Sequence, residues 1–149
     1  MPNTPVAVSG GMILYTLLNV DKTQETEFLE FMSAAGRFDK LQEKLIDAGS
    51  ALSGCGPAFV CQFIEALADG GVACGLPRDK ALLYAAETLK GTAKLMLDTG
   101  EHPANLKDSV CSPGGSTIQG VRRLEQGAFR ADVLDAVIAA YNKTKELGK

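Results

Sequence analysis

The sequence has no tryptophan and only one histidine, His102, among its 149 residues. Its four cysteines include no C-x-x-C pair, so their spacing does not predict a zinc site. We expect no bound metal, and we expect the thiols to stay reduced, as in a cytoplasmic protein. The cysteines are Cys55, Cys61, Cys74 and Cys111.

The sequence also lacks an excess of positive charge and a long apolar run. Its formal net charge is −3, which favours neither a nucleic-acid partner nor an anionic membrane. No uninterrupted apolar run approaches the ~20 residues that span a bilayer. The first residues, MPNTPVAVSG, lack the basic and long apolar segments of a signal peptide. We therefore expect a cytoplasmic chain with no membrane partner.

What is present fits an ordinary globular chain, with 46% hydrophobic and 22% charged residues. The pattern changes near residue 50. Before it, the apolar run 12–20 predicts a buried strand, 23–36 a helix capped by Thr23 and stopped by Gly36, 37–41 a short edge strand and 42–52 a short helix.

After residue 50, apolar residues recur at helical spacing between Gly and Pro residues. The apolar positions of the second of these segments lie widely around the helix, which favours a partner surface. The expected helices span residues 57–75, 77–99, 103–110, 115–127 and 130–147.

Three patterns have both a chemical and a structural interpretation. GCGPAF at 54–59 begins like a dinucleotide fingerprint, but Phe59 replaces the third glycine, so we expect a tight turn. His102, before Pro103, suits a helix cap better than a general base. Glu65 and Asp69, one helical turn apart, suit a solvated face better than a catalytic carboxylate pair.

CSPGGSTIQG at 111–120 is the strongest candidate for a binding site. Gly114 and Gly115 let a ligand approach the backbone closely, and a helix beginning there favours an anion. Ser116 and Thr117 add hydroxyls. Spacing alone leaves a carboxylate site and a simple helix cap equally open, while no P-loop pattern is present for a nucleotide.

Five segments occur in an order that closely resembles pyrroline-5-carboxylate reductase. They are MPNTP, ALSGCGPAFV, EALADGGVACGLPRDKAL, TGEHPANLKDSVCSPGGSTIQGVRRLE and GAFRADVLDAV. The resemblance implies a mainly α fold. Residues 1–50 would be the C-terminal remnant of an NAD(P)-binding Rossmann domain, and 51–149 a helical domain that dimerises by interleaving its helices and binds substrate.

The resemblance also implies the reaction and its residues. The family reduces 1-pyrroline-5-carboxylate to L-proline with NADPH or NADH in proline biosynthesis. Thr117 would lie near the ring nitrogen as the catalytic residue, and Asn3, Thr4 and Pro5 would be the remnant of the cofactor side. The substrate loop would comprise Val110, Ser112, Gly114, Gly115, Ser116 and Thr117. In family members, serine often occupies the positions of Cys55 and Cys111.

Several functional hypotheses follow. The chain, which lacks a G-x-G-x-x-G motif, is expected to bind no cofactor and to be inactive alone, while supplying the homodimer contacts and the substrate loop. The alternative is a non-catalytic paralogue that pairs with full-length subunits, and a third is a related reductase with a different cyclic-imine or amino-acid substrate. We also expect an unpaired strand edge in 1–41 to associate with another chain or to rearrange.

Overall fold

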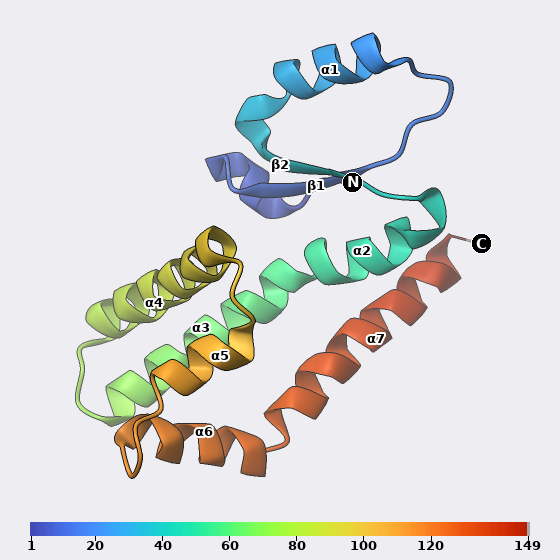
Figure 1. Ribbon diagram of the computed structural model, residues 1–149. Helices are drawn as coiled ribbons and strands as arrows, with labels where there is room; N and C mark the ends of the chain where they lie inside the picture. Colours follow the sequence, from blue (N-terminus) through green and yellow to red (C-terminus); the bar gives the residue numbers. More distant parts are fainter. Residues whose placement is uncertain (149) are drawn as a thin grey trace. The chain divides into compact units, whose positions relative to one another are not determined.

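The computed structural model describes residues 1–148, which form two compact units (Figure 1). The first contains Met1–Phe59 and the chain from Val133 onward, and the second contains Val60–Asp132. Each unit is described by itself.

The first unit is built on a two-stranded parallel sheet. β1 (Gly11–Tyr15) pairs with β2 (Gly36–Lys40), in a register that runs from Gly11 opposite Gly36 to Tyr15 opposite Lys40. Parallel strands need a crossover connection, which α1 (Lys22–Phe31) provides. The other elements before residue 54 are the 3₁₀ turns η1 (Thr4–Val8), η2 (Ser33–Ala35) and η3 (Glu43–Leu45), and α2 (Ile46–Ser53).

The predicted strand 12–20 is only partly correct. β1 ends at Tyr15, and the last ladder bond is donated by the Leu41 N–H to the Tyr15 carbonyl at 2.8 Å. Pairing stops there because β2 is also five residues long. Leu18, which was expected in the strand, is 83% exposed.

The predicted ends of the first helix are wrong. Asp21, not Thr23, is the N-cap: its carboxylate accepts the N–H groups of Thr23 and Gln24, and the Gln24 side chain accepts the Asp21 N–H. This is a capping box, which satisfies more donors than a threonine cap at residue 23 would. The helix ends at Phe31, and Gly36, with φ +137°, begins β2 instead of ending α1.

Three aromatic rings hold α1 on the sheet. Phe28 of α1 packs against Phe38 of β2 at a centroid distance of 5.8 Å and against Tyr15 of β1 at 6.2 Å. Ile13 and Leu14 of β1 and Ala51 of α2 are also buried. The α/β character predicted for the start of the chain is thus confirmed for its elements, while the domain boundary at residue 50 stays a prediction.

The helices predicted after residue 50 are confirmed within one or two residues at each end. Gly75 and Gly100 end two of them in the left-handed conformation, with φ +97° and +69°. The chain is therefore mainly α, as predicted. The helices are α3 (Gly56–Ala73), α4 (Arg78–Thr99), α5 (Pro103–Ser109), α6 (Ser116–Gln126) and α7 (Phe129–Leu147).

The core of the second unit consists of small side chains. Ala68 of α3 lies buried against Ala81 and Ala85 of α4, with Ile64 and Val72 packed beside them. Many larger apolar side chains remain exposed, among them Leu95 at 50% and Leu97 at 64%. A surface this apolar is typical of a chain that associates with another.

By length and composition alone, the helical run Glu43–Ala73 could cross a membrane. This run was not predicted to span a membrane because charged residues such as Asp47 and Glu65 interrupt it. Core helices of soluble proteins share this length and composition, so these two properties do not identify a membrane segment. The absence of a membrane partner stays a prediction.

Candidate functional site

The loop between α5 and α6 brings together the residues predicted to bind substrate. Val110 caps the C-terminus of α5, and Gly115 is the N-cap of α6. Between them, Gly114 adopts φ +71°, and the Gly115 N–H donates to the Ser112 carbonyl at 3.0 Å. Gly114 therefore suits this turn because a residue with a side chain rarely adopts that conformation.

The first turn of α6 offers hydrogen-bond donors at the surface. Within residues 1–148, no side chain caps this helix, and its first turn holds no acidic residue. The N–H groups of Ser116 and Thr117 are the first two of the helix and lack intrahelical acceptors. Both residues are exposed. The helix dipole adds positive potential at the same point, so the geometry suits a carboxylate.

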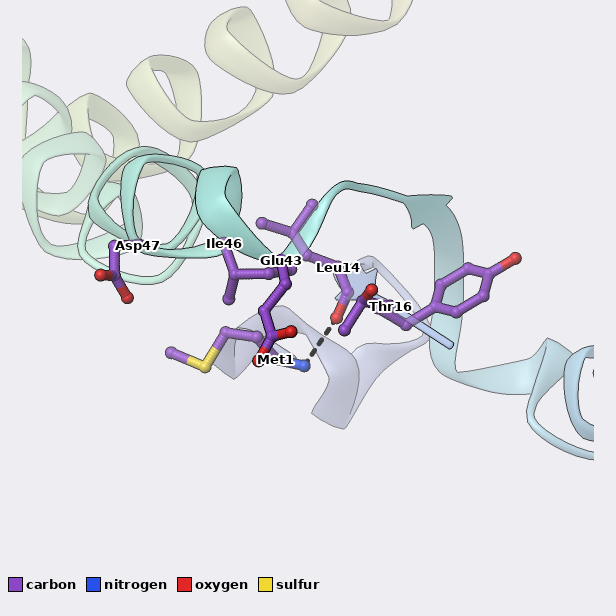
Figure 2. A pocket seen from close by; sticks show the side chains of 7 residues that line it. Met1, Leu14, Thr16, Glu43, Ile46 and Asp47 are labelled. Carbon is purple, nitrogen blue, oxygen red and sulfur yellow. Dashed lines mark hydrogen bonds between the residues drawn. The ribbon is translucent and has the colours of Figure 1, made fainter. Parts of the chain in front are cut away.

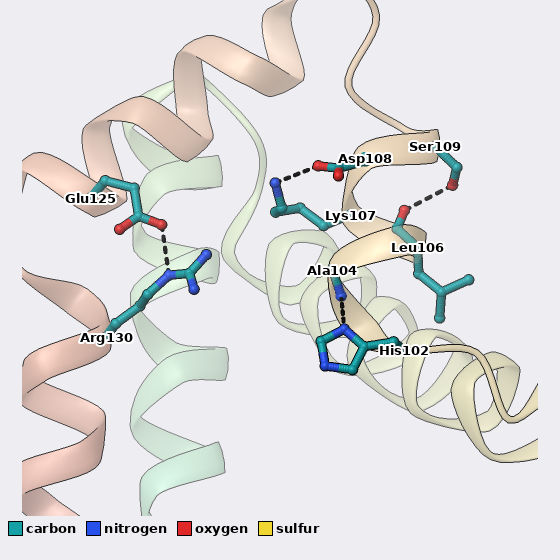
Figure 3. A network of polar contacts seen from close by, with 8 residues as sticks. All are labelled: His102, Ala104, Leu106, Lys107, Asp108, Ser109, Glu125 and Arg130. Atoms are coloured by element: carbon teal, nitrogen blue, oxygen red, sulfur yellow. Dashed lines mark hydrogen bonds and ion pairs between the residues drawn. The ribbon is translucent and has the colours of Figure 1, made fainter.

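Two ion pairs lie on α5, α6 and α7 (Figure 3). Lys107 of α5 donates to Asp108 at 2.5 Å, and this hydrogen bond is the main cause that raises the pKa of Lys107. Arg130 of α7 donates to Glu125 of α6 at 2.7 Å. Arg130 is exposed and Lys107 is half-buried, and both are paired, so their attraction for a nearby anion is modest.

His102 has the structural role predicted for it. It is the N-cap of α5, and its Nδ1 accepts the N–H of Ala104 at 3.2 Å (Figure 3). Asp69 forms an exposed ion pair with Arg78 at 2.5 Å. The interpretation as a solvated helix face is therefore correct for Asp69.

Asn3, Thr4 and Pro5, predicted on the cofactor side, lie in the first unit. Thr4 and Pro5 begin the 3₁₀ turn η1, for which Asn3 is the N-cap residue. The Asn3 side chain has partners inside the unit: its Nδ2 donates to the Ser53 carbonyl at 3.0 Å, and its Oδ1 accepts the Met12 N–H at 2.9 Å.

The first unit also contains a hollow that the sequence did not indicate (Figure 2). The N-terminal amine of Met1 donates to the Leu14 carbonyl at 2.7 Å on one side of it. Glu43 and Asp47, one helical turn apart, bring two carboxylates to its wall. The four-residue spacing of Glu43 and Asp47 is the sequence pattern that could have indicated two neighbouring carboxylates here, although not the hollow itself. The hollow has a volume of about 530 Å³ and is lined by Met1, Leu14, Tyr15, Thr16, Glu43, Ile46 and Asp47.

Among residues 1–148, no group of three or more His, Cys, Asp or Glu side chains could hold a metal ion. The four cysteines are free thiols, with Cys55 and Cys111 half-buried and Cys61 and Cys74 exposed.

Comparison with known proteins identifies the family. A model of the pyrroline-5-carboxylate reductase dimerisation domain matches residues 43–147. Pyrroline-5-carboxylate reductase of Arabidopsis thaliana is 48% identical over 151 residues, which cover 100% of this chain and 54% of that protein. The enzyme of Synechocystis is 48% identical over 153 residues, 100% of this chain and 56% of that protein. The chain thus spans about half the length of these relatives.

Solved structures agree with this result. A Plasmodium falciparum pyrroline carboxylate reductase with NADP bound superposes with a TM-score of 0.92 at 37% identity, covering 100% of this chain and 62% of the other. A pyrroline-5-carboxylate reductase from Coxiella burnetii gives a TM-score of 0.93 at 36% identity, covering 100% and 56%. The predicted fold class is thereby confirmed, and the chain belongs to the pyrroline-5-carboxylate reductase family.

Proposed function

We propose that this chain is part of a cytoplasmic pyrroline-5-carboxylate reductase that makes L-proline. The reaction adds a hydride from NADPH or NADH to the imine carbon and a proton to the nitrogen of 1-pyrroline-5-carboxylate. The observation that carries the proposal is the loop 110–117. It lies inside the region matched by the family model and presents the open N-terminus of α6.

The residues of the loop have different proposed roles. The Gly115 N–H already donates to the Ser112 carbonyl, so the N–H groups of Ser116 and Thr117 donate hydrogen bonds to the substrate carboxylate. The Thr117 hydroxyl then donates a hydrogen bond to the ring nitrogen and relays a proton to it. Val110, Ser112 and Gly114 shape the loop.

We propose that the cofactor is held mainly outside this chain. Thr4 and Pro5 would meet the nicotinamide in the complete enzyme, but the sequence contains no G-x-G-x-x-G motif for a pyrophosphate. The chain alone is therefore expected to bind no cofactor and to show no turnover of NADPH with pyrroline-5-carboxylate.

The proposed partner is a second copy of the chain, joined through helices of residues 51–149. The exposed apolar side chains of α4 support this pairing, since burying them against an identical chain removes apolar area from water.

Titration of the chain with L-proline, followed by amide NMR, tests the substrate loop. The amides of Ser116 and Thr117 are expected to shift with L-proline but not with L-prolinamide, which lacks the carboxylate. Thr117→Val should retain the carboxylate response, because the backbone N–H groups remain. Equal shifts with both ligands, or none at saturating L-proline, would contradict the assignment.

A second candidate function is a non-catalytic module that pairs with full-length reductase subunits. The exposed apolar residues of α4 favour it equally. Mixing the chain with a full-length reductase and measuring subunit exchange tests this second function. A stable mixed dimer, found also in cell extracts of the source, would favour the non-catalytic module over the reductase.

A further inference from the structure

The junction between α2 and α3 contains a carbonyl group without its usual helical donor. α2 ends at Ser53 and α3 begins at Gly56. In a continuous α-helix, the carbonyl of residue 53 would accept the N–H of residue 57. Residue 57 is proline, which has no N–H, so the Ser53 carbonyl needs a donor from elsewhere.

The N–H groups at this junction are used differently. Gly54 and Cys55 both donate to the Ser50 carbonyl, at 2.7 and 3.2 Å, and Ala58 donates to Cys55 at 3.1 Å. None of these bonds reaches the Ser53 carbonyl. The donor to it comes from Asn3, 50 residues earlier, at 3.0 Å.

Asn3 also completes the outer edge of β1. Its Oδ1 accepts the N–H of Met12 at 2.9 Å, on the edge of the strand that does not face β2. Its own carbonyl accepts the Val6 N–H at 3.2 Å within η1. One half-buried side chain therefore joins the start of η1, the edge of β1 and the end of α2.

We propose that Asn3 is a positioning residue that supplies the donor which Pro57 removes and thereby fixes η1 to the α2–α3 junction. The role of η1 on the cofactor side rests on the proposed function. Asn3 itself then acts through Thr4 and Pro5, which it holds in place. Its side-chain amide forms hydrogen bonds to Ser53 and Met12 within the chain.

The first test separates the two hydrogen bonds of Asn3. Asn3→Asp keeps an acceptor for the Met12 N–H and replaces the donor to Ser53 by an oxygen. Hydrogen exchange of the purified chain should become about fivefold to tenfold faster at Cys55 and Ala58, while Met12 stays protected. Asn142→Asp, an equal charge change at an exposed position of α7, should leave all three amides unchanged.

The second test asks whether Pro57 creates the need for Asn3. Pro57→Ala restores an N–H that can donate to the Ser53 carbonyl. In that background, the increase in hydrogen exchange that Asn3→Asp causes at Cys55 and Ala58 should fall to less than about half. A purely structural role of Asn3 at β1 would give the same effect in both backgrounds. Unchanged exchange at Cys55 and Ala58, or an effect of Asn3→Asp that is undiminished by Pro57→Ala, would overturn the proposal.

Neither test uses NADPH or an imine. The coupling between Asn3 and Pro57 can therefore hold in a chain that proves not to be part of a reductase, and it can fail in one that is.

Discussion

Tyr15 and Glu25 form the polar contact between β1 and α1. The Tyr15 hydroxyl donates to Glu25 Oε1 at 2.8 Å, and Lys40 Nζ donates to Oε2 at 3.3 Å. The bond from Tyr15 is the main cause that lowers the pKa of Glu25 below its ordinary 4.5, with Lys40 adding to it. The same bond raises the pKa of Tyr15 above its ordinary 10.0.

We predict that Tyr15→Phe destabilises the chain more at pH 7 than at pH 3. The lowered pKa of Glu25 means that this contact stabilises the fold above pH 4.5 and loses its effect as the pH falls below that value. The raised pKa of Tyr15 means that the stabilisation by this contact is lost again as the pH rises beyond 10.0. Urea unfolding at both pH values measures the difference; an equal loss at pH 3 and pH 7 would show that only packing had changed.

At the scale of elements, hydrophobic spacing and glycine positions predicted almost every helix, because a helix is specified by nearby residues. The errors came where neighbours in space decide. The strand 12–20 was too long because its partner has five residues, and Gly36 begins a strand because it must lie close to Gly11. Asp21 could have been found as a cap from the Asp-x-x-Gln spacing of the capping box.

Gly36 yields a prediction for the sheet. It has φ +137°, and a Cβ there would overlap the backbone O and N of Gly11, its partner in the register. Gly36→Ala should lower the unfolding free energy by about 3 kcal/mol. Gly91 lies inside α4, and a Cβ there would have no heavy atom of the described residues within 4 Å. Gly91→Ala should therefore raise the unfolding free energy by up to about 1 kcal/mol. Urea unfolding followed by circular dichroism compares them, and a harmless Gly36→Ala would contradict the register.

At the scale of the whole molecule, the apolar surface decides how the chain exists in solution. The core of residues 60–132 is built of alanines, and leucines on both flanks of α4 remain exposed. A wide apolar distribution around α4 was visible in the sequence, and it predicted a partner surface without saying which residues would be covered.

Leu95→Asp tests this surface. We expect light scattering to show a dimer of the chain at micromolar concentration. The dimer dissociation constant of the variant should be at least about tenfold higher, since a leucine is lost from the interface. Lys90→Ala, with the same change in net charge on the polar side of α4, should remain dimeric. A wild-type monomer would count against both the helical dimer and the strand association predicted for residues 1–41.

The candidate site was predictable to different degrees in its two parts. The candidate loop 110–117 is contiguous, so a short characteristic pattern was enough to define it. The role of Asn3 was not predictable, because its partner Ser53 lies 50 residues away and no spacing rule connects them. The hollow beside Met1 likewise depends on which elements the fold brings together.

The proline in the α2–α3 junction also has a consequence for how such sequences diverge. A chain with an ordinary residue at position 57 has its own donor for the Ser53 carbonyl and no longer requires an amide at position 3. Substitutions at these two positions are then not independent. We expect Asn3 and Pro57 to be retained or lost together during evolution, although 54 positions of sequence separate them.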